Sequence, residues 1–190
     1  VFAFEPSVDA CRLLAMSLQG NSITNVHVTN AALGSERGSM RLVVPEQEVT
    51  NRGGARLAGV DSTLGGELVG STVDVEVGDD ALCDTRGVQY IKIDVEGAEA
   101  EVIKGLYGTL ERERPVVSVE VLNPMAKRRV EAIFGQLGFA GVALVRGRRT
   151  RRVVPLSEVA DPDLSGVSLV HFMPSPFAEA LIGTRVRELG

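Results

Sequence analysis

The stretch from Tyr90 to Glu99 constrains the fold most, because a strand-like pattern changes there directly into a helical one. Its first half is rich in β-branched and aromatic residues, which favours a strand. Gly97 then permits a turn, and apolar residues follow at helical spacing, which predicts a helix over about 98–110. A strand that leads straight into a helix is the repeating unit of a parallel α/β sheet.

Three acids, Asp94, Glu96 and Glu99, fall at this junction. Ligands of open α/β sheets bind beyond the carboxyl ends of the strands, so the junction is a candidate site. Asp94 follows an apolar strand, and burial would raise the pKa of its carboxyl group unless a cation compensated. It could act as a base or orient a hydroxyl group. Glu96 and Glu99 are weaker candidates, since acids also favour helix N-termini, and Glu99 borders the apolar stripe and would need a partner. No histidine lies nearby in the sequence, so we expect no metal site.

The rest of the chain repeats the same alternation of strand, turn and helix. Strands are expected at 1–4, 26–28, 40–44, 72–77, 90–95, 116–121, 142–145, 153–154 and 168–173. Helices are expected from Ser7 to Gly20, over 98–110, near 126–137 and at the end over 177–189. This order predicts one α/β domain over 1–190 with a doubly wound, mostly parallel sheet and a late antiparallel strand. The polar, glycine-rich stretch 45–71 predicts a loop or lid excursion.

Two further strand ends carry side chains that suit a nucleotide. Glu5 lies at the tip of the first strand, where an acid can accept hydrogen bonds from both hydroxyls of a cofactor ribose. It could equally be a solvated acid at a strand end. Asn30 and Ala31 follow the next strand, where the amide could meet an adenine edge or cap the turn.

Composition excludes several classes of protein. The net charge of −5 gives no drive toward nucleic acid, and the arginines at 146–152 have no aromatic residues between them, so a solvated hairpin is expected there. No run approaches the roughly 18 apolar residues that a membrane span needs. Cys11 and Cys83 lack metal-type spacing and fit a reducing compartment, so we expect a cytoplasmic protein. His27 and His171 lie inside strands and are expected to be structural.

Four segments together resemble a known family. They are VFAFEPS at 1–7, IKIDVEGAE at 91–99, VIKG at 102–105, and RP at 114–115 before a strand that ends in Glu120. Over about residues 1–145 the combination resembles the FkbM-type methyltransferases. The resemblance implies a Rossmann-like fold and S-adenosylmethionine (SAM) as the cofactor. It assigns ribose binding to Glu5 and places Asp94 near the site of methyl transfer.

The sequence departs from that family in two places. A preceding strand with an Asp-x-Gly-Ala-Asn turn, which would hold the methionine part of SAM, is not present. The missing strand would lie between 1–4 and 91–95, leaving two strands to face a gap. Because the chain also opens inside an apolar run, we expect a fragment of a longer protein. The second departure is Val77-Gly78-Asp79 in place of Thr-Leu-Asp, which leaves the role of Asp79 open.

The resemblance implies an O-methyltransferase that acts on a hydroxyl of a small-molecule or glycan acceptor. Asp94 would orient or deprotonate that hydroxyl, while Asn30 and Ala31 would border the adenine. The fragment alone is expected to bind SAM poorly or not at all. Two other classes stay open, a nicotinamide-dependent oxidoreductase with the same sheet and a non-catalytic Rossmann-like domain. The sequence does not identify the acceptor or the oligomeric state.

Overall fold

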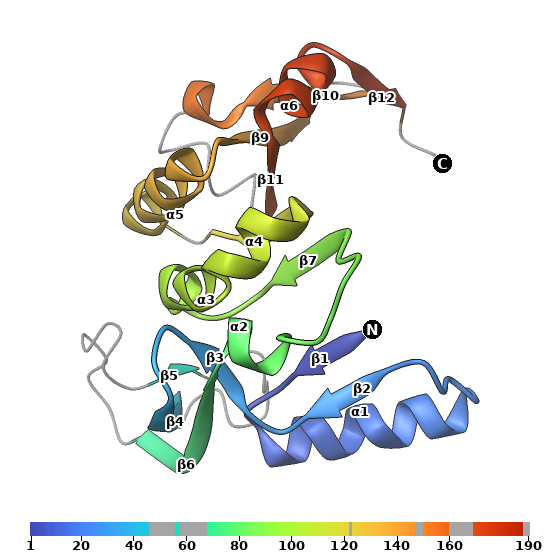
Figure 1. Cartoon of the computed structure of the whole chain (residues 1–190), viewed down its shortest axis with the longest axis vertical. Helices are drawn as coiled ribbons and strands as arrows, with labels where there is room; N and C mark the ends of the chain where they lie inside the picture. The colour runs from blue at the N-terminus through green and yellow to red at the C-terminus, as the bar shows by residue number, and fades with distance from the viewer. Residues whose placement is uncertain (46–55, 58–67, 122, 147–149, 160–168, 188–190) are drawn as a thin grey trace.

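The computed structural model describes residues 1–45, 56–57, 68–121, 123–146, 150–159 and 169–187, which form a mixed α/β structure (Figure 1). This confirms the α/β class expected from the sequence, but the expectation of one mostly parallel sheet is wrong, because the described strands form three sheets and most ladders of the largest sheet are antiparallel. Within those ranges the strands form three sheets. The longest helices, α1 (Val8–Gly20) and α5 (Pro124–Gln136), have 13 residues each, and no helix of the described ranges is long and apolar enough to cross a membrane.

The largest sheet has the strand order β12-β10-β9-β11-β8-β7. Its strands are β7 (Tyr90–Ile93), β8 (Val116–Glu120), β9 (Phe139–Arg146), β10 (Thr150–Pro155), β11 (Leu169–Pro174) and β12 (Arg185–Arg187). β7 and β8 are parallel, while β11 lies antiparallel between β8 and β9, which confirms the late antiparallel strand. A core of buried residues joins one face of this sheet to α3 and α5, where the rings of Phe134 and Phe172 stack with centroids 4.2 Å apart.

A second sheet contains β3 (Ala32–Gly34), β4 (Gly38–Pro45), β5 (Arg56–Leu57) and β6 (Leu68–Val77). β4 and β6 pair antiparallel from Gly38↔Val75 to Pro45↔Leu68. The predicted excursion over 45–71 is therefore wrong at its end, because residues 68–71 continue the β6 ladder. It is also interrupted by β5. The remainder of that prediction, at 46–55 and 58–67, lies outside the described residues.

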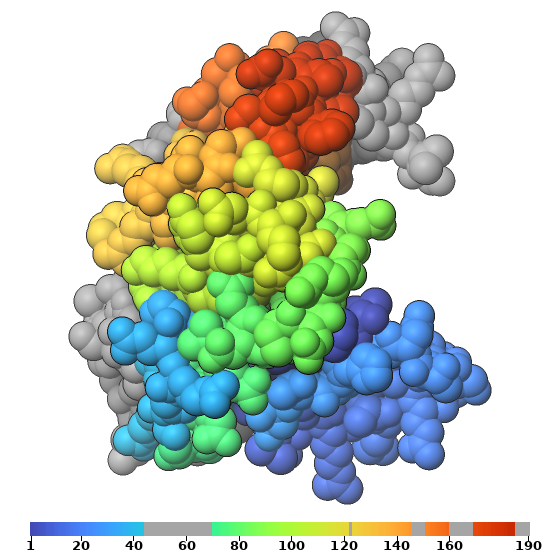
Figure 2. All heavy atoms as spheres, in the orientation of Figure 1, coloured from blue at the N-terminus to red at the C-terminus, as the bar shows by residue number. Residues whose placement is uncertain are grey.

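The third sheet holds only β1 (Phe2–Phe4) and β2 (His27–Thr29), which are parallel, with α1 connecting them. In the described part of the chain β1 does not pair with β7, so the predicted gap between these two strands is present. Figure 2 shows the dark-blue N-terminal residues between the green segment around β7 and the light-blue part that contains α1 and β2. β1 and β7 thus belong to different sheets and share no ladder of hydrogen bonds.

The helix predicted over 98–110 is broken, which corrects the sequence-based expectation. It forms α3 (Glu99–Gly105) and α4 (Tyr107–Glu113), with Leu106 between them. The Asp79 carboxylate, at the start of α2 (Gly78–Ala81), accepts hydrogen bonds from the Gly108 and Thr109 amides, each at 2.7 Å. Asp79 therefore caps the first amides of α4, which allows a new helix to begin there and gives Asp79 a structural role.

The C-terminal helix predicted over 177–189 is also wrong in extent. α6 (Ser175–Leu181) is short, and Gly183 adopts a φ of +84° that takes the chain out of the helix. Residues 185–187 then pair antiparallel with β10 as β12. A sheet edge with open hydrogen-bonding groups is a non-local partner, which helical periodicity in the sequence cannot reveal.

Candidate functional site

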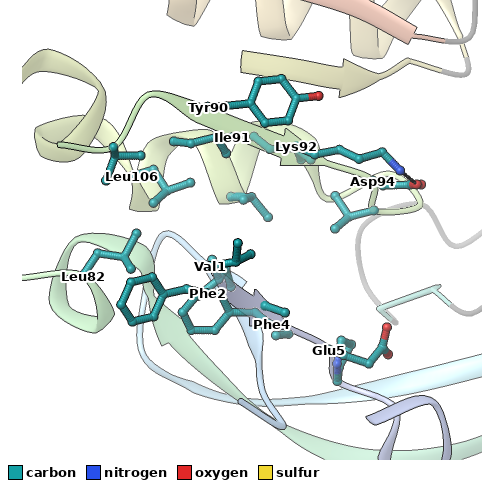
Figure 3. A pocket seen from close by; sticks show the side chains of 18 of the residues that line it. Val1, Phe2, Phe4, Glu5, Leu82, Tyr90, Ile91, Lys92, Asp94 and Leu106 are labelled. Carbon is teal, nitrogen blue, oxygen red and sulfur yellow. Dashed lines mark hydrogen bonds and ion pairs between the residues drawn. The ribbon is translucent and has the colours of Figure 1, made fainter. Parts of the chain in front are cut away.

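A cavity of about 920 Å³ lies between β1 and β7 (Figure 3). Residues 1–7 line one side, and residues 85–96 line the other. Its floor is apolar and includes Leu82 and Leu106, which Figure 3 shows at the opposite end from Glu5 and Asp94. Because β1 and β7 both end at the same side, the carboxylates gather where the two strands stop, as expected for an open α/β sheet.

Glu5 follows β1 and is held in place by its local turn. Its Oε1 accepts a hydrogen bond from the Ser7 amide at 2.8 Å, and Ser7 in turn caps α1 through a hydrogen bond from the Ala10 amide to its hydroxyl. The carboxylate is therefore oriented before any ligand arrives. Its place on the cavity wall is compatible with the predicted contact to a ribose, which stays a prediction.

Asn30 makes contacts that favour the turn-capping alternative. Its Nδ2 donates to the carbonyl oxygens of Glu5 at 2.9 Å and of Pro6 at 3.1 Å, so it ties the end of β2 to the turn after β1. Ala31 is buried, with 2% of its surface exposed. Neither residue is among those that line the cavity in the described structure. Their predicted border with adenine stays a prediction.

Asp94 lies at the end of β7 and forms an ion pair with Lys92. The distance from Lys92 Nζ to Asp94 Oδ2 is 2.5 Å, and the two residues share a face because side chains alternate along a strand (Figure 3). The hydrogen bond from Lys92, and then the neighbouring Glu120 carboxyl group, lowers the pKa of Asp94, and together they outweigh the effect of burial. A raised pKa for Asp94 was expected only without a compensating cation, and Lys92 is that cation.

Glu120 is a site residue that the sequence analysis did not assign. The register Ile93↔Val119 of the parallel pair β7–β8 puts Glu120 beside Asp94 at the ends of adjacent strands. The neighbouring Asp94 carboxyl group, and then burial, raises the pKa of Glu120. The sequence signal was its position as the last residue of a strand. That signal has meaning only once β8 is known to be the neighbour of β7.

The two remaining acids have different positions. Glu96 lines the cavity, whereas Glu99 does not line it among the described residues. The Glu99 side chain is buried, with 3% of the residue exposed, and its Oε1 accepts a hydrogen bond from the Gly97 amide at 2.9 Å. Burial raises the pKa of the Glu99 carboxyl group. Glu99 therefore holds the turn after β7, and Glu5, Asp94 and Glu96 are the predicted acids that meet around the cavity.

Neither histidine belongs to this cavity in the described structure. His27 stacks on Phe2 with ring centroids 5.4 Å apart, and His171 Nδ1 lies 2.7 Å from the hydroxyl of Ser118 on the neighbouring strand. Burial lowers the pKa of His171. Among the described residues no group of three or more His, Cys, Asp or Glu side chains could hold a metal ion.

The chain matches one family model over most of its length. A family model described as "Methyltransferase FkbM domain" matches residues 1–140. Among solved structures, the methyltransferase FkbM from Methylobacillus flagellatus KT is similar, with 16% sequence identity and a TM-score of 0.49. That match covers 90% of this chain but 36% of the other, so this chain spans about a third of that protein's length. No curated protein matches.

Proposed function

The chain belongs to the FkbM methyltransferase family, and on that basis we propose that it takes part in methyl transfer from SAM to a hydroxyl group. The family match confirms the resemblance seen in the sequence. The observation that supports the finer proposal is the cavity between β1 and β7, at which Glu5 and Asp94 share one end. The acceptor we propose is a small molecule or a glycan.

The cavity suits a nucleotide-type cofactor in size and in chemistry. Its volume, about 920 Å³, lies within the usual range of about 300–1,000 Å³ for small-molecule sites. Many of its lining residues are apolar, and the carboxylates of Glu5, Asp94 and Glu96 follow the ends of β1 and β7. Glu5 supplies two carboxylate oxygens, which match the paired hydroxyls of a ribose. Ser7 would keep that carboxylate oriented.

The chemistry proposed for the chain's own residues is mainly the positioning of reactants. SAM supplies an electrophilic methyl group on a sulfonium centre. Asp94 would accept a hydrogen bond from the acceptor hydroxyl and then its proton, while Lys92 holds the Asp94 carboxylate in place. Holding two reactants in line can replace much of the entropy that a bimolecular reaction must lose.

Two other functions compete with this proposal. A nicotinamide-dependent oxidoreductase could use the same kind of sheet, with Glu5 on a ribose of NAD. A non-catalytic domain would require no cofactor. The three functions differ in the ligand that the cavity accepts.

Calorimetric titration separates these functions. SAM, S-adenosylhomocysteine and NAD are each titrated into this chain and into any longer product of the same gene. Binding of SAM and S-adenosylhomocysteine, but not NAD, supports the methyltransferase. Binding by a longer product alone supports it too, and shows that further residues complete the cofactor site. Binding of NAD favours the oxidoreductase, and binding of none of the three favours a non-catalytic domain.

A variant of Glu5 tests the ribose contact in the form that binds SAM. Glu5→Ala should weaken SAM binding about 10- to 100-fold, since a hydrogen bond to a charged group contributes about 1.5–3 kcal/mol. The matched control is Glu111→Ala, which removes an exposed carboxylate from α4. Equal SAM affinity of Glu5→Ala and wild type would remove the ribose role.

A further inference from the structure

We propose that Glu120 is a positioning residue that shares with Asp94 the proton taken from the acceptor hydroxyl. The two carboxyl groups would then accept that proton as one unit. The inference rests on the proposed function, and it deepens that function by adding a residue to the site. Glu120 does not line the cavity in the described structure, so it would act through Asp94.

The geometry of the sheet places the two groups together. β7 and β8 are parallel and in register from Tyr90↔Val116 to Ile93↔Val119, so the next residue of each strand is an acid. Asp94 faces the cavity, and Glu120 stands behind it on the neighbouring strand. The register puts the two carboxyl groups side by side on adjacent strands, where each changes the pKa of the other.

Lys92 makes the two carboxyl groups unequal. Its ammonium group lies 2.5 Å from Asp94 Oδ2, and this contact lowers the pKa of Asp94. Asp94 alone would therefore be a weak base. Glu120 has a raised pKa, so it holds a proton more strongly than Asp94 does. A pair of carboxyl groups whose environments separate their pKa values is a typical acid–base arrangement.

Other charged groups near the pair have identified effects. Glu96, on the turn after β7, raises the pKa of Glu120, and Lys92 lowers it. Tyr90, on β7, acts on Lys92 rather than on the acids. On β11, Leu169 is opposite Glu120 and contributes no charge. Further along β11, the pKa of His171 is lowered by burial, so it carries no charge above its usual titration range.

The transfer step balances with this pair in place. The acceptor oxygen forms a bond to the methyl carbon as the carbon–sulfur bond breaks, and the electrons of that bond stay on sulfur. The acceptor O–H bond breaks, and its proton moves to Asp94. Glu120 then shares that proton, which compensates for the basicity that Lys92 removes from Asp94. Water takes the proton when the pair returns to its starting state.

Nuclear magnetic resonance titration of the labelled carboxyl carbons tests the pair in the form of the protein that binds SAM. In Asp94→Asn the titration midpoint of Glu120 should fall toward that of an exposed glutamate, because its partner has no charge. In Glu120→Gln the first proton should enter the site at a lower pH than in wild type. The control is Glu101→Gln, which removes a carboxylate that pairs with Lys104 on α3 and should leave both midpoints unchanged.

Addition of SAM links the pair to the reaction. The sulfonium carries a positive charge, so SAM should lower both midpoints more than the neutral S-adenosylhomocysteine does. An unchanged Glu120 midpoint in a folded Asp94→Asn variant would overturn the shared proton. Equal effects of SAM and S-adenosylhomocysteine would overturn the placement of the pair beside the reacting atoms. Failure of SAM to bind would instead overturn the proposed function, even if the shared proton were observed.

Discussion

Replacement of Gly105 by alanine tests how α3 is held against the rest of the domain. Gly105 is the last residue of α3, and Gly34 is the last residue of β3. A Cβ atom at position 105 would lie 2.0 Å from the Gly34 carbonyl oxygen and 2.8 Å from its carbonyl carbon. The neighbouring atoms belong to the backbone, so no side chain can rotate away.

Gly105→Ala changes the free energy of unfolding in two opposite ways. Alanine favours a helix over glycine by about 1 kcal/mol. Real Cβ atoms essentially never lie closer than 3.0 Å to another heavy atom, so α3 and β3 would have to separate by about 1 Å. Such overpacking costs about 1–3 kcal/mol, occasionally more, and backbone on both sides favours the upper end. We therefore expect a net loss of about 2 kcal/mol, a large part of a typical stability of about 5–15 kcal/mol.

Urea unfolding followed by circular dichroism measures this loss. The matched control is Gly135→Ala near the end of α5, because a Cβ there would meet nothing within 4 Å. That control should gain up to about 1 kcal/mol from helix propensity alone. If Gly105→Ala were as stable as wild type, the close contact between Gly105 and Gly34 would not exist in solution.

Three further predictions concern the acids. Asp94→Asn should abolish most methyl transfer from labelled SAM to an accepted hydroxyl compound. The affinity for SAM, measured by calorimetry, should stay nearly intact. Turnover equal to that of wild type would contradict the catalytic role of Asp94. Glu99→Gln should raise the free energy of unfolding at neutral pH. Burial raises the folded-state pKa of Glu99, so the stabilising contribution of Glu99 is present below the ordinary glutamate pKa and is lost as pH rises through the raised value. At neutral pH the wild type therefore buries a carboxylate, whereas the variant buries a neutral amide. Urea unfolding at two pH values would show the gain disappear toward about pH 4, and a loss at neutral pH would refute this reasoning. Asp79→Ala should lower the free energy of unfolding by about 1–2 kcal/mol, because it removes the cap of α4. The control Asp80→Ala breaks an exposed ion pair with Arg37 and should lower it by less than about 1 kcal/mol in the same assay.

Local features of the fold could be read from the sequence because their energies depend on neighbours in the chain. Ser7 caps α1 as expected, since a hydroxyl before an apolar helical pattern satisfies the first amides. The strand before Asp94 and the turn at Gly97, whose φ is +89°, also follow from local propensity. The family resemblance depended on these same local segments.

Features that depend on distant partners could not be read in this way. The break between α3 and α4 requires Asp79, which precedes Thr109 by 30 residues. The tail forms a strand because β10 offers an open edge. In each case local propensity predicted one continuous helix, and a hydrogen bond or ladder from elsewhere in the chain changed the outcome.

The candidate site also combines features that depend on the local sequence with features that depend on distant partners. The positions of Glu5 and Asp94 at strand ends follow from the sequence, because strand and turn signals are local. The shared cavity of these two acids, and the position of Glu120 beside Asp94, depend on how the strands are arranged in space. Strand order sets which carboxyl groups become neighbours, and their contacts with Lys92 and with one another then set their pKa values.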